Sequence, residues 1–313
     1  MKILLLAGGW SSEREVSLNG AREIEKALRR MGHQTRLLDP LTDLSELATN
    51  AVDQDFIFIN MHGSPGEDGL IQAMIEKIPA PYNGSDSAAS LIALNKFVTK
   101  IYYRKAGLRV CPEAFITFAQ KEKAKPAFSY PVIMKGNVSG SSADLFRIES
   151  ETELEKVLAS SVRGGRDEFI VEPMIDGTDV TCPVFGNVGQ RAQAMPTILI
   201  KPASGGIFDY HAKYSDGGAD EICPAPLDEK LTREIQKMAA TAHEALGLSG
   251  FSRSDFMVDR EGTPFILETN TLPGMTPNSL LPKSAKAIGM TFEDLLEKIL
   301  NLGLEKFDSV HKR

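Results

Sequence analysis

The chain has 313 residues and a net charge of -7, with 42% hydrophobic and 25% charged residues. This length and composition predict a globular protein of two or three domains. The negative charge argues against a nucleic-acid partner, and no apolar run approaches the ~20 residues of a membrane span. The three cysteines, Cys111, Cys182 and Cys223, are far apart and have no CxxC spacing. This pattern predicts reduced thiols and a cytoplasmic protein.

The first third of the chain predicts a parallel sheet of βαβ type. Strands are expected at 2–7, 35–39 and 56–61, with a helix at 16–31. The apolar opening is too short for a signal peptide and is interpreted as a buried strand. The absence of a GxGxxG fingerprint disfavours a Rossmann dehydrogenase. Before the helix, Ser12-x-x-Glu15 predicts a capping box, which is the favoured role for Glu15.

The rest of the chain predicts two α+β units. A single helical pattern is expected over 85–108, and Gly107 ends it. A small unit follows, and a larger one begins near Asp179. The expected strands are 114–118, 131–135, 145–148, 168–172, 180–185 and 192–200, and the expected helices are 151–159, 228–246 and 291–302. The predicted fold class is α/β and α+β, divided at 1–95, 96–178 and 179–313.

Residues 250–259 and 264–270 predict a β-hairpin. If its turn is centred on Glu261-Gly262, Asp255 faces Glu268 and Arg253 faces Asn270. Facing Cβ atoms lie roughly 5 Å apart, so two carboxylates there repel by about 3 kcal/mol at an effective dielectric near 20.

A bound cation would remove this repulsion, and the oxygen ligands suit Mg²⁺ better than zinc. The alternative is a solvated face whose acids splay apart. The opposite face is expected to bury Phe256, Val258, Phe265 and Leu267.

Other polar residues follow predicted strands. Glu13 could hold a substrate ammonium, and His62 has functional and structural interpretations of about equal weight. Lys135 enters the Gly/Ser loop GNVSGSSAD, which could wrap phosphate oxygens although it lacks the P-loop order. Lys213 and Tyr214 lie in a Gly-flanked stretch that could form a lid. With the hairpin acids, this set suggests nucleotide triphosphate chemistry outside the P-loop class.

The segments SEREVSL, HGSPGEDG, DYHAKY, SRSD and ETNTLPGMTPNSL, taken in this order, resemble the D-alanine–D-alanine ligases of the ATP-grasp superfamily. The resemblance covers essentially the whole chain. It implies a three-domain ATP-grasp fold with ATP between the central and C-terminal domains. It further implies ligation of two D-alanine molecules for peptidoglycan, through an acyl phosphate, by a cytoplasmic enzyme that is usually a homodimer. The cofactors implied are ATP and two Mg²⁺ ions, with Mn²⁺ as a possible substitute.

The resemblance also assigns residue roles around the amino acid substrates. Glu13 would bind the ammonium of the first D-alanine, and His62 would lie near its carboxylate. Ser279 and Leu280 would hold the carboxylate of the second D-alanine.

Catalytic roles follow from the same resemblance. Arg253 and the backbone of Gly274 would stabilise the oxyanion. Ser141 and Tyr214 would join Glu13 in a network that fastens the lid.

Nucleotide and metal contacts are implied in the same way. The residues implied at the phosphates are Lys96, Lys135 and Lys213. Glu172 would meet the adenine and Asp179 the ribose. The metal ligands implied are Asp255, Glu268 and Asn270, in agreement with the hairpin register.

Several positions depart from the usual family pattern. Gly136 stands where proline is usual, Asp144 where glycine is usual, Pro173 where lysine is usual and Asp179 where glutamate is usual. The altered loop at 136–144 keeps an ATP-binding homologue with little ligase turnover as one alternative. A related ligase that joins D-alanine to D-serine, D-lactate or another amino acid is the other.

Overall fold

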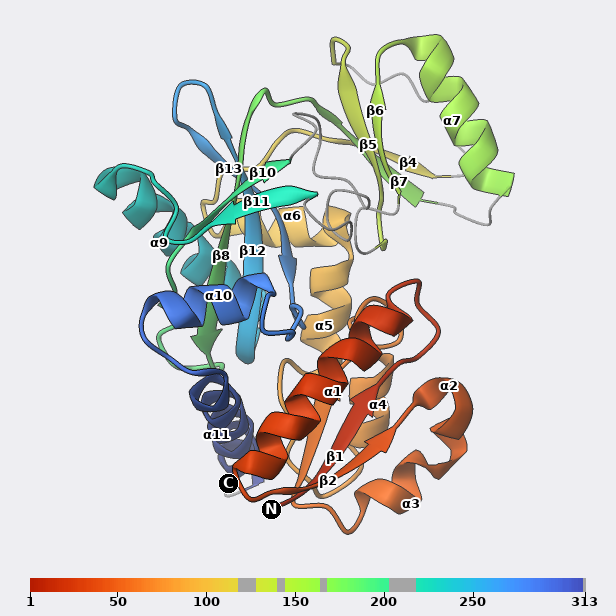
Figure 1. Cartoon of the computed structure of the whole chain (residues 1–313). Coiled ribbons are helices and arrows are strands. Elements are labelled where there is room, and N and C mark those ends of the chain that lie inside the picture. The colour runs from red at the N-terminus through yellow and green to blue at the C-terminus, as the bar shows by residue number, and fades with distance from the viewer. Residues whose placement is uncertain (118–127, 140–143, 164–167, 203–217, 312–313) are drawn as a thin grey trace.

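The computed structural model describes residues 1–117, 128–139, 144–163, 168–202 and 218–311 (Figure 1). Within these ranges the strands form a three-stranded, a four-stranded and a six-stranded sheet. No helix in the same ranges is long and apolar enough to cross a membrane.

The N-terminal sheet is parallel, as predicted, with the order β2-β1-β3. Its strands are β1 (Lys2–Ala7), β2 (Gln34–Leu38) and β3 (Phe56–Asn60). Its helices are α1 (Arg14–Arg30), α2 (Pro40–Asp43), a 3-10 turn (Leu44–Glu46), α3 (Leu47–Ala51) and α4 (Leu70–Ile75). Strand β1 is buried along its length after Lys2, because both of its neighbours are β-strands and α1 covers it.

The single helix predicted over 85–108 is wrong. The chain forms α5 (Ser87–Leu94) and α6 (Lys96–Lys105), separated at Asn95. Asn95 is extended, with φ -81° and ψ 99°, and its side chain accepts a hydrogen bond of 3.0 Å from the Val98 amide. An asparagine that caps a new helix competes with continuation of the preceding one. The helical spacing of apolar residues therefore continues across a position where the helix itself ends.

The middle sheet is antiparallel with the order β4-β7-β5-β6. Its strands are β4 (Ala114–Thr117), β5 (Val132–Gly136), β6 (Leu145–Ile148) and β7 (Glu168–Pro173), and helix α7 (Glu151–Arg163) packs beside β6. These strands match the predicted ones within a residue or two. The helix is longer than the predicted 151–159.

The largest sheet has the order β11-β10-β8-β12-β13, with β9 paired to β8. Its strands are β8 (Gly177–Gly186), β9 (Gln193–Ala194), β10 (Ile198–Pro202), β11 (Ala219–Ile222), β12 (Gly250–Asp259) and β13 (Pro264–Asn270). The single strand predicted at 192–200 is wrong, because Pro196 lacks the N–H that a continuous ladder needs. Its helices are α9 (Glu229–Ala245), α10 (Leu280–Ala287) and α11 (Phe292–His311), of which α10 was not predicted and α11 exceeds the predicted 291–302.

The hairpin of β12 and β13 has the predicted register where its acids lie. Asp255 faces Glu268 and Arg253 faces Asn270. Beyond Asp255 the register shifts, so Phe256 pairs with Ile266.

This bulge corrects the predicted core face of the hairpin. Ile266, at 0% exposure, lies in the core with Phe256 and Val258, whereas Phe265 and Leu267 are only half-buried. A bulge adds one residue to one strand and exchanges the faces on one side of it.

Helix α11 lies beside α1, so the C-terminal helix returns to the N-terminal sheet (Figure 1). Leu295, Leu296 and Ile299 belong to the same apolar cluster as β1 and β3. A second cluster joins α5, α6 and α9 to the large sheet, and a third fills the middle sheet. The division at 1–95, 96–178 and 179–313 stays a prediction.

Candidate active site

Two adjoining cavities meet at the hairpin acid Glu268. The first, of about 250 Å³, lies between the middle sheet and the large sheet and is lined by Lys135, Glu172 and Asp179. The second, of about 310 Å³, is lined by residues that follow β1, β3 and β13. Glu268 and Ser139 line both cavities. The two cavities therefore adjoin at Glu268 and Ser139.

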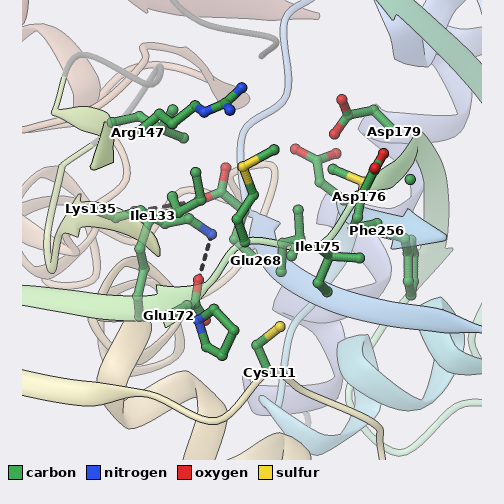
Figure 2. A pocket seen from close by; sticks show the side chains of 18 of the residues that line it. Cys111, Ile133, Lys135, Arg147, Glu172, Ile175, Asp176, Asp179, Phe256 and Glu268 are labelled. Carbon is green, nitrogen blue, oxygen red and sulfur yellow. Dashed lines mark ion pairs between the residues drawn. The ribbon is translucent and has the colours of Figure 1, made fainter. Parts of the chain in front are cut away.

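The first cavity brings together four of the five residues implied for nucleotide contacts: Lys96, Lys135, Glu172 and Asp179. Figure 2 shows Lys135 and Glu172 joined by an ion pair on one side, with Asp176 and Asp179 across the space. The pair is 2.7 Å long, from Lys135 Nζ to Glu172 Oε2. Burial alone would raise the pKa of Glu172, but the charges of Lys135 and Lys100 outweigh it and lower that pKa below its ordinary value.

Lys135 and Glu172 belong to an ion chain that sequence reasoning did not identify as a chain, and it is buried except at Arg104, whose side chain is 43% exposed. Its members, in order of contact, are Arg104, Glu113, Lys100, Glu172 and Lys135. Lys100, whose side chain is 1% exposed, bonds Glu172 and donates a hydrogen bond of 2.8 Å to the carbonyl of Cys111. Helical spacing put Lys100 on α6, but its partner is 72 positions away. No local signal identifies such a contact.

The facing hairpin acids are each balanced by a protein cation. Arg253 holds Asp255 with two hydrogen bonds of 2.9 and 2.8 Å, and the buried Thr181 hydroxyl donates another of 2.5 Å. Lys96 Nζ lies 3.3 Å from Glu268 Oε2. The predicted repulsion is therefore already relieved within the protein.

The oxygen donors of Asp255, Glu268 and Asn270 still suit a hard cation, since they lie at one end of one hairpin and line the cavities. Within the residues that the structure describes, there is no group of three or more His, Cys, Asp or Glu side chains that could hold a metal. A divalent ion at this place needs the Asn270 amide or a substrate oxygen as a further ligand.

The second cavity is lined by Glu13, His62, Glu67 and Arg253. Glu13 is 8% exposed and occupies the N-cap position of α1. The predicted capping box is wrong, because the N-cap is Glu13 instead of Ser12, no side chain caps the helix, and the exposed Glu15 pairs with Arg14. Glu13 is thereby placed where a buried acid can meet an ammonium.

His62 and Glu67 both form hydrogen bonds with the backbone of Leu272. The Leu272 carbonyl accepts a hydrogen bond of 3.0 Å from His62 Nδ1, and its amide donates one of 3.3 Å to Glu67. A carbonyl only accepts, so Nδ1 carries the proton of a neutral His62. Burial lowers the pKa of His62, against the opposing charge of Glu13. This leaves Nε2 of His62 as an acceptor.

Glu67 is the second buried group that sequence reasoning missed. Burial, and then the charge of Glu13, raise its pKa to about 8, against hydrogen bonds from Gly63 and Leu272. The motif HGSPGEDG pointed to this loop through His62, but not to the carboxyl four residues beyond Gly63. The contact to Leu272 spans 205 positions and has no local signature.

Gly274, Ser279 and Leu280 also line the second cavity. Ser279 is the N-cap of α10, and its hydroxyl bonds Thr276 through the amide, at 3.2 Å, and the hydroxyl, at 2.8 Å. A Cβ on Gly274 would come within 3.0 Å of the Ser279 hydroxyl oxygen. Glycine therefore lets this backbone approach the start of α10.

The predicted site residues Ser141, Lys213 and Tyr214 lie outside the described residues. All the others line one or both cavities. Their individual roles stay predictions.

Comparisons with known proteins identify relatives of the whole chain. The family model "D-ala D-ala ligase C-terminus" matches residues 103–301. A D-alanine–D-alanine ligase of Nitratidesulfovibrio vulgaris (strain DP4) is 48% identical, over 97% of this chain and 98% of that protein. A structure of D-alanine–D-alanine ligase from Bacillus anthracis complexed with ATP has a TM-score of 0.84 at 29% identity, over 99% of both chains.

The structure of VanG D-Ala:D-Ser ligase from Enterococcus faecalis has a TM-score of 0.80 at 26% identity, over 96% of this chain and 98% of that one. The predicted ATP-grasp fold class is confirmed by these likenesses. The length and identity of these matches establish the family of the chain. The chain belongs to the D-alanine–D-alanine ligase family.

Proposed function

We propose that this chain joins two D-alanine molecules to D-alanyl-D-alanine at the expense of ATP, in peptidoglycan synthesis. The observation that carries the proposal is Glu268, which lines both cavities. Nucleotide bound beside Lys135 and amino acids bound beside Glu13 would meet at this acid. Membership of the family supports the same activity.

The chemistry proceeds in two steps. A carboxylate oxygen of the first D-alanine attacks the γ-phosphorus of ATP, and ADP leaves as an acyl phosphate forms. The amine nitrogen of the second D-alanine attacks the acyl carbon, phosphate leaves, and the nitrogen gives up its proton. Arg253, which lines the second cavity and is held by Asp255, is proposed to stabilise charge on the tetrahedral oxygen together with Gly274.

We assign the metal to Asp255, Glu268 and Asn270, because their oxygens suit Mg²⁺ and their carboxylates face each other. When bound, Mg²⁺ would neutralise the transferring phosphoryl group. Lys96 is well placed to assist, since its ammonium already lies near Glu268. A homodimer in the cytoplasm is proposed from the family resemblance alone.

The test is incubation of the protein with ATP, Mg²⁺ and D-alanine, followed by mass spectrometry of the products. We expect D-alanyl-D-alanine, with phosphate release that depends on D-alanine. Glu268→Gln should lower turnover at least about 100-fold. The matched control is Glu261→Gln, an exposed acid in the turn of the same hairpin. Phosphate release without dipeptide, or no release at all, would favour a nucleotide-binding homologue with little turnover.

A second candidate is ligation of D-alanine to D-serine. It is favoured by the likeness to VanG D-Ala:D-Ser ligase and by the polar wall of the second cavity, which includes Glu221, Thr276 and Asn278. Competition between D-alanine, D-serine and D-lactate as acceptors separates the candidates. A D-serine product in excess over the D-alanine product at equal concentrations would select the second.

A further inference from the structure

The ion chain makes conflicting demands on Lys135. Its ammonium lies 2.7 Å from Glu172 Oε2, yet Lys135 also lines the cavity proposed for ATP. One ammonium can donate several hydrogen bonds, but the strong attraction of a phosphate would draw it away from the carboxylate. The other oxygen of Glu172 is bonded by Lys100. Lys100 is not one of the described residues that line the cavity.

We propose that Lys135 changes partner when nucleotide binds, from Glu172 to a phosphate, and that Lys100 is the positioning residue that keeps Glu172 ionised and in place. This inference rests on the proposed binding of ATP. It assigns to Lys100 a role in nucleotide affinity although Lys100 itself touches no ligand. The released oxygen Oε2 of Glu172 becomes free to accept a hydrogen bond from the amino group of the base.

Lys100 has enough contacts of its own to keep its position when Lys135 moves to the nucleotide. Besides Glu172, it is held by the Cys111 carbonyl at 2.8 Å and lies 3.6 Å from Glu113 Oε2. Its side chain is 1% exposed, against 13% for Lys135. The less exposed lysine with more partners remains, and the one at the cavity wall moves.

Electrostatics explain why two lysines are needed. In the part of the chain that the structure describes, the charged or titratable groups around Glu172 are Lys135 from β5, Lys100 from α6, and Cys111 and Glu113 from the segment before β4. Without Lys100, departure of Lys135 would remove both cations that bond the buried carboxylate of Glu172 within the described residues, and a buried carboxylate that loses its cations takes up a proton. Nucleotide binding would then be coupled to protonation of Glu172.

The experiment is calorimetric titration of the full chain with ADP and Mg²⁺, which avoids turnover, in two buffers of different ionisation enthalpy. For the wild type we expect proton uptake near zero. For Lys100→Met we expect about one proton taken up at pH 8, with affinity at least tenfold weaker there and a smaller loss at pH 6. The control is Lys105→Met, an exposed lysine on the same helix, which should behave as the wild type.

Rescue comes from the double variant Lys100→Met, Glu172→Gln. Its proton uptake should return to zero, because no carboxyl remains to titrate. Affinity of Lys100→Met within twofold of the wild type, without linked protons, would overturn the exchange. If the wild type itself bound no ADP, both the exchange and the proposed function would fail. Normal ADP binding by the wild type and by Lys100→Met, without linked protons, would contradict the exchange alone.

A second measurement covers the case in which Lys100→Met does not fold. In Glu172→Gln the carboxylate no longer competes for Lys135, so tripolyphosphate with Mg²⁺, which has no base to recognise, should bind at least threefold tighter than to the wild type. Equal or weaker binding of tripolyphosphate to Glu172→Gln contradicts the exchange.

Discussion

Replacement of Glu67 by glutamine is expected to remove a pH dependence from the stability of this protein. Glu67 is 7% exposed, and burial with the neighbouring Glu13 raises its pKa from 4.5 to about 8. A folded-state pKa above the unfolded one means that the folded protein keeps a proton that the unfolded chain has lost. The stabilisation is full below pH 4.5 and disappears as the pH rises to about 8.

The size of the effect follows from the slope of about 1.4 kcal/mol per pH unit for one proton. Between pH 6.5 and 8, Glu67 should remove about 2 kcal/mol from the free energy of unfolding of the wild type. Burial lowers the pKa of His62, and the wild type and Glu67→Gln share this histidine, so the difference between their pH dependences reports on Glu67. Glu67→Gln keeps an acceptor for one of the two amides and carries no titratable proton.

The measurement is urea unfolding at four pH values between 6.5 and 8.5, followed by far-ultraviolet circular dichroism. The free energy of unfolding of Glu67→Gln should fall less with pH than that of the wild type, by about 2 kcal/mol across the range. Glu155→Gln, an exposed acid on α7, is the control and should follow the wild type. Parallel curves for the wild type and Glu67→Gln would show that Glu67 is ionised throughout, and the reasoning would be refuted.

Three further predictions concern packing, a buried hydroxyl and the metal. Gly303→Ala should destabilise the fold by about 1 to 3 kcal/mol, because a Cβ there would meet the Phe56 ring at 2.6 Å; an unchanged urea midpoint would contradict this. Tyr103→Phe should cost about 1 kcal/mol, since its hydroxyl bonds Thr269 at 2.6 Å and is fully buried; a more stable variant would show that this bond is strained. Chelation with EDTA should abolish phosphate release, and excess Mg²⁺ or Mn²⁺ should restore it; activity that survives chelation would remove the metal from the proposal.

The centre of the candidate site was predictable from the sequence because a hairpin is a local structure. Once the turn was placed at Glu261-Gly262, pleating alone put Asp255 opposite Glu268. The same rule failed for the buried face, because the bulge that pairs Phe256 with Ile266 leaves no mark in the pattern of apolar residues. The alternation of apolar and polar residues predicts which side chains share a face of a strand. It does not show where a bulge adds one residue to the strand.

Helix boundaries and buried charges were harder to predict for a different reason. Asn95 ends one helix and caps the next, but the apolar spacing continues across it, so the break was invisible to a count of periods. Lys100 looked like an ordinary helical lysine. Its importance comes from Glu172, which reaches it only after the middle sheet has folded beside α6. Such pairings belong to the tertiary structure.

The return of helix α11 to the N-terminal sheet has a consequence for biosynthesis. Leu295 and Leu296 complete the apolar layer around β1, although they are made almost 300 residues after it. The first sheet is therefore synthesised long before helix α11, and the side that α11 covers stays exposed until α11 has been made. Chains that terminate prematurely within α11 would expose an apolar surface on the N-terminal sheet. Chaperones that bind exposed apolar segments would be expected to retain such chains.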